Sequence, residues 1–122
     1  MAQSFDLLVI GGGSGGIASA IQAAKLGAKC AVVEAQQLGG TCVNLGCVPK
    51  KMMWYASHIA ELLAKAPDYA FQIDKPSLDW ATLVANRQQY IAHLRQIYAR
   101  RLQDHQIQHI VGYARFVDNV FW

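Results

Sequence analysis

A glycine-rich turn between an apolar run and a helical pattern constrains the fold of this chain more than any other feature. Residues 5–10 (FDLLVI) predict a strand buried on both faces of a parallel sheet. Residues 11–16 (GGGSGG) follow, and small and apolar residues then recur at helical spacing from Ser14 to Gly27. A second apolar run at 29–34 completes a βαβ unit. The sequence therefore predicts an α/β protein with a parallel sheet and flanking helices.

The turn also carries the glycine spacing of the dinucleotide-binding fingerprint, at Gly11, Gly13 and Gly16. The helix that opens there would offer free N–H groups and a positive dipole end to a pyrophosphate, and a side chain on Gly13 would block that approach. Glu34 ends the second strand, where a carboxylate can accept hydrogen bonds from ribose hydroxyls. The alternative is an ordinary strand–turn–helix without a ligand.

The rest of the chain predicts a polar loop at 35–46 and a helix at 47–66. Asp79 is the expected N-cap of a long amphipathic helix that ends near Gln103. Two short strands are predicted at 107–111 and 114–117.

Two cysteines separated by four residues stand between these elements. Cys42 would lie in the loop and Cys47 would begin the helix, so a disulfide could form without distorting a regular turn. Cys47 is expected to be reactive, because the start of a helix and the nearby Lys50 and Lys51 stabilise a thiolate. The pair indicates redox chemistry.

Two other interpretations of the cysteines stay open at this point. Cys42 and Cys47 could be packed thiols, or they could form part of a zinc site with His58. Cys30 lies inside a predicted strand and is expected to be a small buried hydrophobe.

Composition excludes several classes of protein. With 53% hydrophobic and 16% charged residues the chain is expected to be globular. A net charge of +3 with dispersed arginines argues against nucleic-acid binding. The first ten residues lack the pattern of a signal peptide or membrane span, so no membrane association and a cytoplasmic location are expected.

Residues 39–51 (GGTCVNLGCVPKK) resemble the active-site signature of the flavoprotein pyridine nucleotide-disulfide oxidoreductases, and within that family they look most like the glutathione reductases. Dihydrolipoamide dehydrogenases and mercuric reductases usually have serine in place of Lys50, and trypanothione reductases typically have glutamate in place of Ala18. Further similar segments are residues 11–20, 53–54, 67–69 and 112–118.

The resemblance implies a Rossmann-like FAD-binding domain that works with NADPH. Ser14 and Gly15 would hold the FAD pyrophosphate, Thr41 its phosphate region and Lys50 the flavin ring. The expected FAD contacts are Gly11, Gly13, Ser14, Gly15, Gly16, Glu34, Thr41, Cys42, Lys50 and Ala114.

The resemblance also assigns the catalytic roles. Cys47 would exchange electrons with the flavin, Cys42 would attack glutathione disulfide, and Lys50 would tune the flavin. Ser14 and Tyr98 would contact the substrate, although Tyr98 could simply pack in the core and Ser14 could simply cap a helix.

This chain departs from the family pattern in two ways. Ile21 and Gln22 stand where some glutathione reductases carry arginines that receive a substrate carboxylate. Residues 1–122 are also expected to be only the first part of the FAD-binding domain. The NADPH-binding domain, the dimerisation domain and the histidine that the partner subunit supplies in the homodimer would then be missing. A fragment of a related reductase and a nucleotide-binding module without catalysis are the alternatives.

Overall fold

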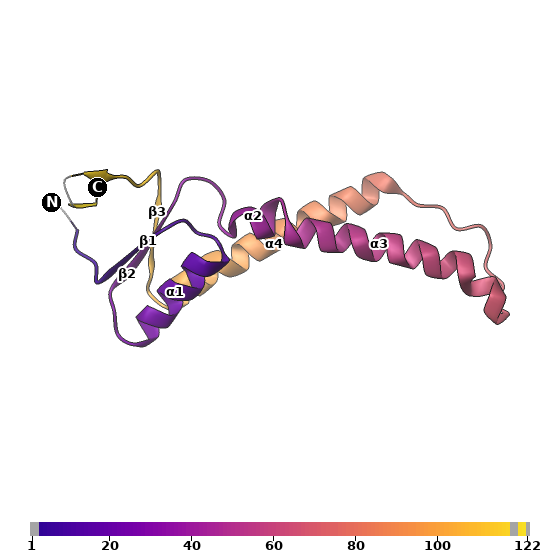
Figure 1. Ribbon diagram of the computed structural model, residues 1–122, viewed down its shortest axis with the longest axis horizontal. Coiled ribbons are helices and arrows are strands. Elements are labelled where there is room, and N and C mark those ends of the chain that lie inside the picture. The colour runs from indigo at the N-terminus through magenta and orange to yellow at the C-terminus, as the bar shows by residue number, and fades with distance from the viewer. Residues whose placement is uncertain (1–2, 118–119, 122) are drawn as a thin grey trace.

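The computed structural model describes residues 3–117 and 120–121, which form a small parallel sheet and a long arm of two helices (Figure 1). The sheet has the order β1-β2-β3, and both pairs of neighbouring strands are parallel. Its strands are β1 (Leu7–Ile10), β2 (Cys30–Glu34) and β3 (Gln108–Val111). A separate antiparallel pair consists of β4 (Phe116–Val117) and β5 (Val120–Phe121). The predicted α/β class with a Rossmann-like parallel sheet is confirmed.

Strand β2 is the centre of the sheet and of the core. Its first four residues are buried, and helix α1 (Ser14–Lys25) packs against both β1 and β2. The prediction that β1 is buried on both faces is wrong: β1 is an edge strand, its first three residues are only half-buried and Ile10 is 50% exposed. The main buried cluster comprises Ile17, Ala20, Ile21, Cys30, Val32, Leu38, Leu102 and Ile107.

The segment between β2 and β3 is mainly helical. Helix α2 (Gly40–Asn44) lies where a loop was predicted, so that prediction is wrong. Helix α3 (Cys47–Lys65) begins at the predicted residue and passes into the short 3-10 helix η1 (Ala66–Tyr69). Helix α4 (Trp80–Asp104) is capped as predicted, because the Thr82 N–H donates to Asp79 Oδ1 at 3.1 Å.

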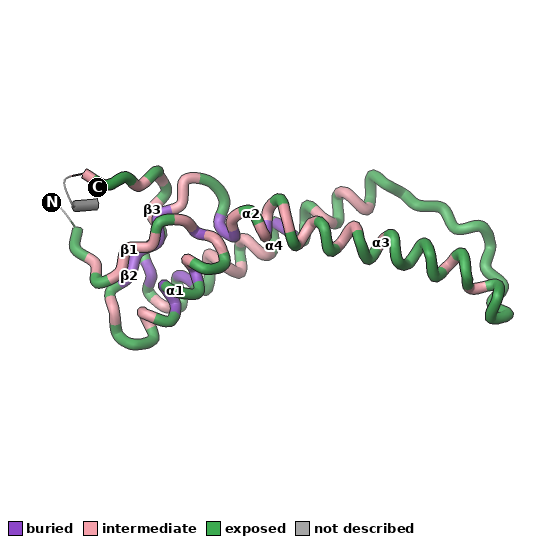
Figure 2. The backbone as a smooth tube through the Cα atoms, in the orientation of Figure 1, coloured by how far each residue is buried: buried purple, intermediate pink, exposed green. Residues whose placement is uncertain are grey.

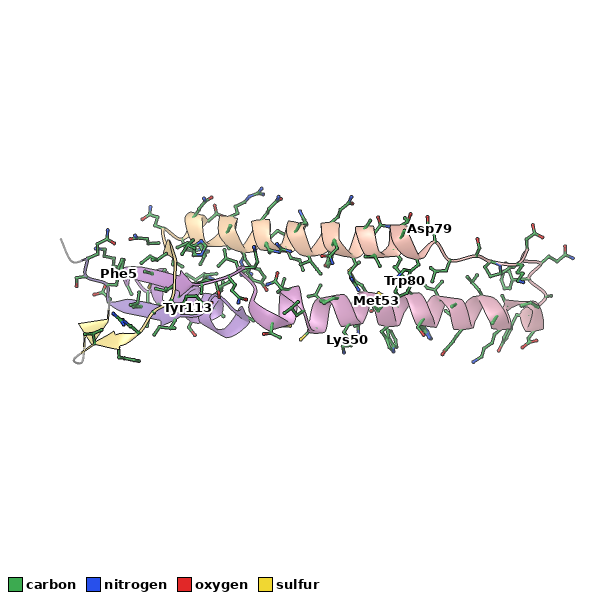
Figure 3. All side chains as sticks on the ribbon, turned by 90° about the horizontal axis from the view of Figure 1, so that it is seen from above. Phe5, Lys50, Met53, Asp79, Trp80 and Tyr113 are labelled. Atoms are coloured by element: carbon green, nitrogen blue, oxygen red, sulfur yellow. The ribbon has the colours of Figure 1, made fainter. Side chains whose placement is uncertain are left out.

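Helices α3 and α4 run side by side and project away from the sheet as the arm (Figures 1 and 3). Helix α3 has no buried residue, and large side chains such as Trp54 and Trp80 are more than half exposed. On α4 the predicted apolar side is buried at Ile91 and Leu102, whereas Tyr90 is 47% exposed. Buried positions accordingly gather at the sheet end of the molecule (Figure 2).

Within the described ranges, none of the helices is both long and apolar enough to span a membrane.

Candidate redox-active thiol site

Glu34 ties the glycine turn to the end of β2. The Gly12 N–H donates to Glu34 Oε2 at 2.7 Å, and the Gln36 N–H donates to Glu34 Oε1 at 2.8 Å. These bonds, with the one from Gln36 contributing most, lower the pKa of Glu34 against the opposing effect of burial. The carboxylate is therefore ionised at neutral pH and fixes the turn, while its contact with a ribose stays a prediction.

The Glu34 clamp predicts an acid-sensitive contribution to stability. A pKa lowered by folding gives a stabilisation that is fully present above the ordinary value of 4.5 and is lost as the pH falls through the folded-state pKa. Glu34→Gln should therefore be less stable than the unchanged protein at pH 7, and the difference should shrink below pH 4.5.

Urea unfolding across this pH range measures the effect, with Asp74→Asn, at an exposed position before α4, as the control. A difference between Glu34→Gln and the unchanged protein that stays constant down to pH 3 would contradict the clamp.

Helix α2 docks directly on the glycine turn. The Gly39 N–H donates to the Gly12 carbonyl oxygen at 2.7 Å, and Gly13 and Gly39 form an isolated parallel bridge. A Cβ on Gly40 would lie 2.9 Å from the Gly13 Cα, so the two backbones meet where only glycine fits. The same turn that would receive a pyrophosphate therefore positions the helix that carries Cys42.

Asn44 fixes the other end of α2. Its Nδ2 donates to the carbonyl oxygens of Gly40 at 2.9 Å and Leu38 at 3.1 Å. These bonds hold the short helix against the loop that precedes it, which explains how five residues of low intrinsic stability remain helical.

The two predicted redox cysteines lie together at the junction of α2 and α3. Cys42 is half-buried within α2, Cys47 is the exposed first residue of α3, and both are free thiols. The pKa of Cys42 is raised, first by the hydrogen bond between its thiol and the Cys47 side chain and then by burial. The thiols therefore interact, although Cys42 belongs to a helix and not to the predicted loop.

A cavity of about 530 Å³ opens beside Cys47, between α3 and α4. Lys50, one turn after Cys47, lines it together with Lys51, Tyr55 and Tyr90. Figure 3 shows Lys50 on α3, with α4 alongside. A thiol-bearing residue, Cys47, and two cationic residues, Lys50 and Lys51, thus line the same cavity.

A second cavity has a volume of about 470 Å³ and is lined by Glu34 and Thr41. Asn44 and Arg95 also line it, and among the described residues the buried Asn44 Oδ1 and Arg95 Nε have no hydrogen-bond partner. Ala114 comes two residues after Gly112, whose N–H donates to the Glu34 carbonyl oxygen at 3.0 Å. Most of the predicted FAD contacts thus lie at the carboxyl ends of parallel strands, where dinucleotides bind in this fold class.

The residues of the turn fit a pyrophosphate. A Cβ added to Gly15 would meet no heavy atom within 4 Å, and the same holds for Gly11. Gly16, in contrast, faces the protein, because its Cβ would overlap the Gly11 carbonyl oxygen. The space above the start of α1 is open to a ligand, whereas the third fingerprint glycine serves close packing of helix and strand.

Ser14 and Tyr98 line one common cavity of about 160 Å³ between α1 and α4. Tyr98 is partly buried and packs against the main buried cluster, which is the alternative role predicted for it. Its contact with substrate, like that of Ser14, stays a prediction.

No group of three or more His, Cys, Asp or Glu side chains is placed to hold a metal ion within residues 3–117 and 120–121. His58, the third ligand considered for zinc, stacks on Trp54 with ring centroids 5.2 Å apart.

Sequence reasoning did not identify Asn44 or Arg95 as parts of the site. The Arg95 side chain donates to Gln37 Oε1 at 3.2 Å across 58 positions of the chain. That contact joins distant segments, so no local pattern could have indicated Arg95.

Comparison with known proteins agrees with this geometry. Residues 5–120 match the family model described as pyridine nucleotide-disulphide oxidoreductase. The chain is 47% identical over 114 residues to glutathione reductase from Yarrowia lipolytica, covering 90% of this chain and 24% of the relative. It is 42% identical to glutathione reductase from Debaryomyces hansenii, covering 96% of this chain and 25% of the relative. The chain thus spans about a quarter of the length of these curated relatives. It belongs to the pyridine nucleotide-disulphide oxidoreductase family.

Proposed function

We propose that residues 1–122 are the amino-terminal part of the FAD-binding domain of a longer, NADPH-dependent glutathione-disulfide reductase. The observation that carries this proposal is the docking of α2, with Cys42, on the glycine turn, and the interaction of Cys42 with Cys47 at the start of α3. The similarity to two glutathione reductases supports the choice of substrate.

The chain's own residues would hold FAD along the carboxyl edge of the sheet. Ser14 and Gly15 would donate backbone N–H groups to the pyrophosphate, Glu34 would accept from the ribose, and Lys50 would place a positive charge beside the flavin. When bound, FAD would supply the two-electron transfer between NADPH and the cysteine pair.

The cysteine pair would perform the exchange with substrate in two steps. The Cys42 thiolate attacks one sulfur of glutathione disulfide, forms a mixed disulfide and expels one glutathione thiolate, which takes up a proton. The Cys47 thiolate then attacks the Cys42 sulfur, forms the Cys42–Cys47 disulfide and releases the second glutathione. Two electrons pass from the dithiol to the substrate, and the pair is left as the Cys42–Cys47 disulfide.

The raised pKa of Cys42 indicates that this mechanism needs a base. The resemblance to glutathione reductases leads us to include in the proposal that a histidine of the partner subunit, in a homodimer, supplies this base. A cytoplasmic location is also part of it, because reducing compartments keep such thiols available.

The test is substrate-dependent NADPH oxidation by the complete flavin-loaded protein that carries this chain. We expect glutathione disulfide to support faster turnover than lipoamide or Hg(II). Faster turnover with either of these would contradict the proposed substrate, and bound flavin without turnover of any of the three would indicate a binding module.

A further inference from the structure

Arg95, in the second half of α4, reaches across to the loop that leads into α2. Its side chain donates to Gln37 Oε1 at 3.2 Å, and 58 positions of the chain separate the two residues. Gln37 lies two residues before Gly39, the N-cap of α2. Arg95 thus ties the long helix of the arm to the start of the segment that carries Cys42.

The same loop is joined to the far end of α2 by Asn44. The Asn44 Nδ2 donates to the Leu38 carbonyl oxygen at 3.1 Å and lies 3.5 Å from the Gln37 carbonyl oxygen. A continuous set of contacts therefore runs from Arg95 through the loop to Asn44, the last residue of the helix that contains Cys42.

A polar cavity, and not close apolar packing, separates α2 from α4 at this point. Thr41 and Asn44 of α2 line it together with Gln88 and Arg95 of α4, and most of its other residues are polar as well. Among residues 3–117 and 120–121, the buried Arg95 Nε and Asn44 Oδ1 have no hydrogen-bond partner. The position of α2 relative to α4 therefore depends on polar contacts such as the one from Arg95 to Gln37.

The cysteine pair is sensitive to the position of α2. Two cysteines form an unstrained disulfide only when their Cβ atoms lie about 3.5–4.5 Å apart. Cys42 and Cys47 belong to different helices, so a rotation of α2 changes their separation. A helix of five residues has little stability of its own, and its orientation is set by the contacts that hold it.

We infer that Arg95 is a positioning residue for the redox pair. Its hydrogen bond to Gln37 holds α2 in the orientation in which Cys42 and Cys47 form their disulfide. This inference rests on the proposed function and adds a residue far from the signature at 39–51. Loss of the bond lowers the effective concentration of one thiol at the other, so the dithiol is favoured over the disulfide.

The positive charge of Arg95 offers a competing explanation, because a cation near a thiol stabilises its thiolate. Arg95→Met removes the charge and the hydrogen bond together, whereas Gln37→Leu removes the hydrogen bond and keeps the charge. Gln37 is exposed, so Gln37→Leu should fold even if Arg95→Met does not. The matched control is Arg100→Met, which removes an exposed arginine from the same helix.

The experiment measures the equilibrium between the Cys42–Cys47 disulfide and the dithiol in the complete flavin-loaded protein. The unchanged protein, both single variants and the double variant are equilibrated in mixtures of reduced glutathione and glutathione disulfide. Acid quenching, alkylation and mass spectrometry then give the state of the pair. Two glutathione thiols supply two electrons and two protons to the protein disulfide and become one glutathione disulfide, so the ratio gives the equilibrium constant without any turnover.

Arg95→Met, Gln37→Leu and the double variant should all shift this equilibrium toward the dithiol by the same factor. The expected factor is about fivefold, the effect of one hydrogen bond, which corresponds to a reduction potential about 20 mV higher. Equal shifts are expected because one bond is lost in each case. Arg100→Met should leave the equilibrium unchanged, and flavin absorbance should be the same in all variants.

The outcomes separate the hypotheses. A shift with Arg95→Met but not with Gln37→Leu would assign the effect to charge and overturn the positioning role. Lower melting temperatures without a shift would show a structural role only, and shifts that add in the double variant would show independent effects. In these cases the proposed function stands. If the unchanged protein forms no Cys42–Cys47 disulfide, the proposed function fails, and the inference fails with it.

Discussion

Cys42→Ser and Cys47→Ser should each abolish NADPH-dependent reduction of glutathione disulfide by the complete protein, with a loss of at least about a thousandfold in kcat. Serine cannot form or exchange a disulfide, so Cys42→Ser removes the group that attacks the substrate. Cys47→Ser leaves the mixed disulfide on Cys42 without the thiol that resolves it. Steady-state NADPH oxidation with saturating glutathione disulfide measures both effects.

Two controls show whether these variants lose chemistry or structure. Reduction of ferricyanide by NADPH needs bound flavin and no thiol, so both serine variants should retain it. Cys30→Ala should keep glutathione disulfide reduction, because Cys30 is buried in β2 and its thiol donates to the Ala28 carbonyl oxygen at 3.4 Å. Normal glutathione disulfide turnover by either serine variant would refute the role given to that cysteine.

Gly16→Ala should destabilise the fold by about 3 kcal/mol, the upper part of the range for overpacked sites. The new methyl group would overlap the Gly11 carbonyl oxygen and approach Val9 Cγ1 to 2.8 Å. Neither neighbour can yield easily, because Val9 pairs with Val32 in the sheet and the Gly11 N–H donates to the Val33 carbonyl oxygen at 2.8 Å. Urea unfolding of the complete protein measures the loss.

Gly15→Ala is the matched control one residue earlier. Its methyl group would meet no heavy atom within 4 Å, and alanine favours a helix over glycine by up to about 1 kcal/mol, so stability should stay equal or rise. Flavin affinity should nevertheless fall, since the methyl group would occupy the space proposed for the pyrophosphate. Equal stability of the two variants would contradict the packing role of Gly16, and unchanged flavin affinity of Gly15→Ala would contradict the cradle.

The sequence predicted the elements whose signals are local. Glycines at both ends define α1, Asp79 caps α4 through Thr82, and the apolar run 30–34 forms the central strand. Helix α2 escaped prediction because its five residues depend on contacts of Gly39 with the glycine turn and of Asn44 with Leu38 and Gly40. Among the described residues β1 has a neighbour on one side, so it is less buried than its apolar run predicts.

In the candidate site, too, residues close in sequence could be associated by spacing, whereas residues far apart could not. Cys42 and Cys47 are close in sequence, so their interaction followed from spacing and from the start of α3. Ser14 and Tyr98 were associated only through family resemblance, and the structure places both at one cavity. Arg101 also lines that cavity, and it is the packing of α4 against α1 that brings it there.

The position of β2 between β1 and β3 has a consequence for synthesis on the ribosome. β2 ends at Glu34 and β3 begins at Gln108, so about seventy residues must be translated before the second edge of β2 can find its partner. At 5–20 residues per second this takes about 4 to 14 s. During that interval the apolar strand has an unpaired edge, which is a template for association with other chains. Chaperone demand and yield on expression should therefore depend on how fast this segment is translated.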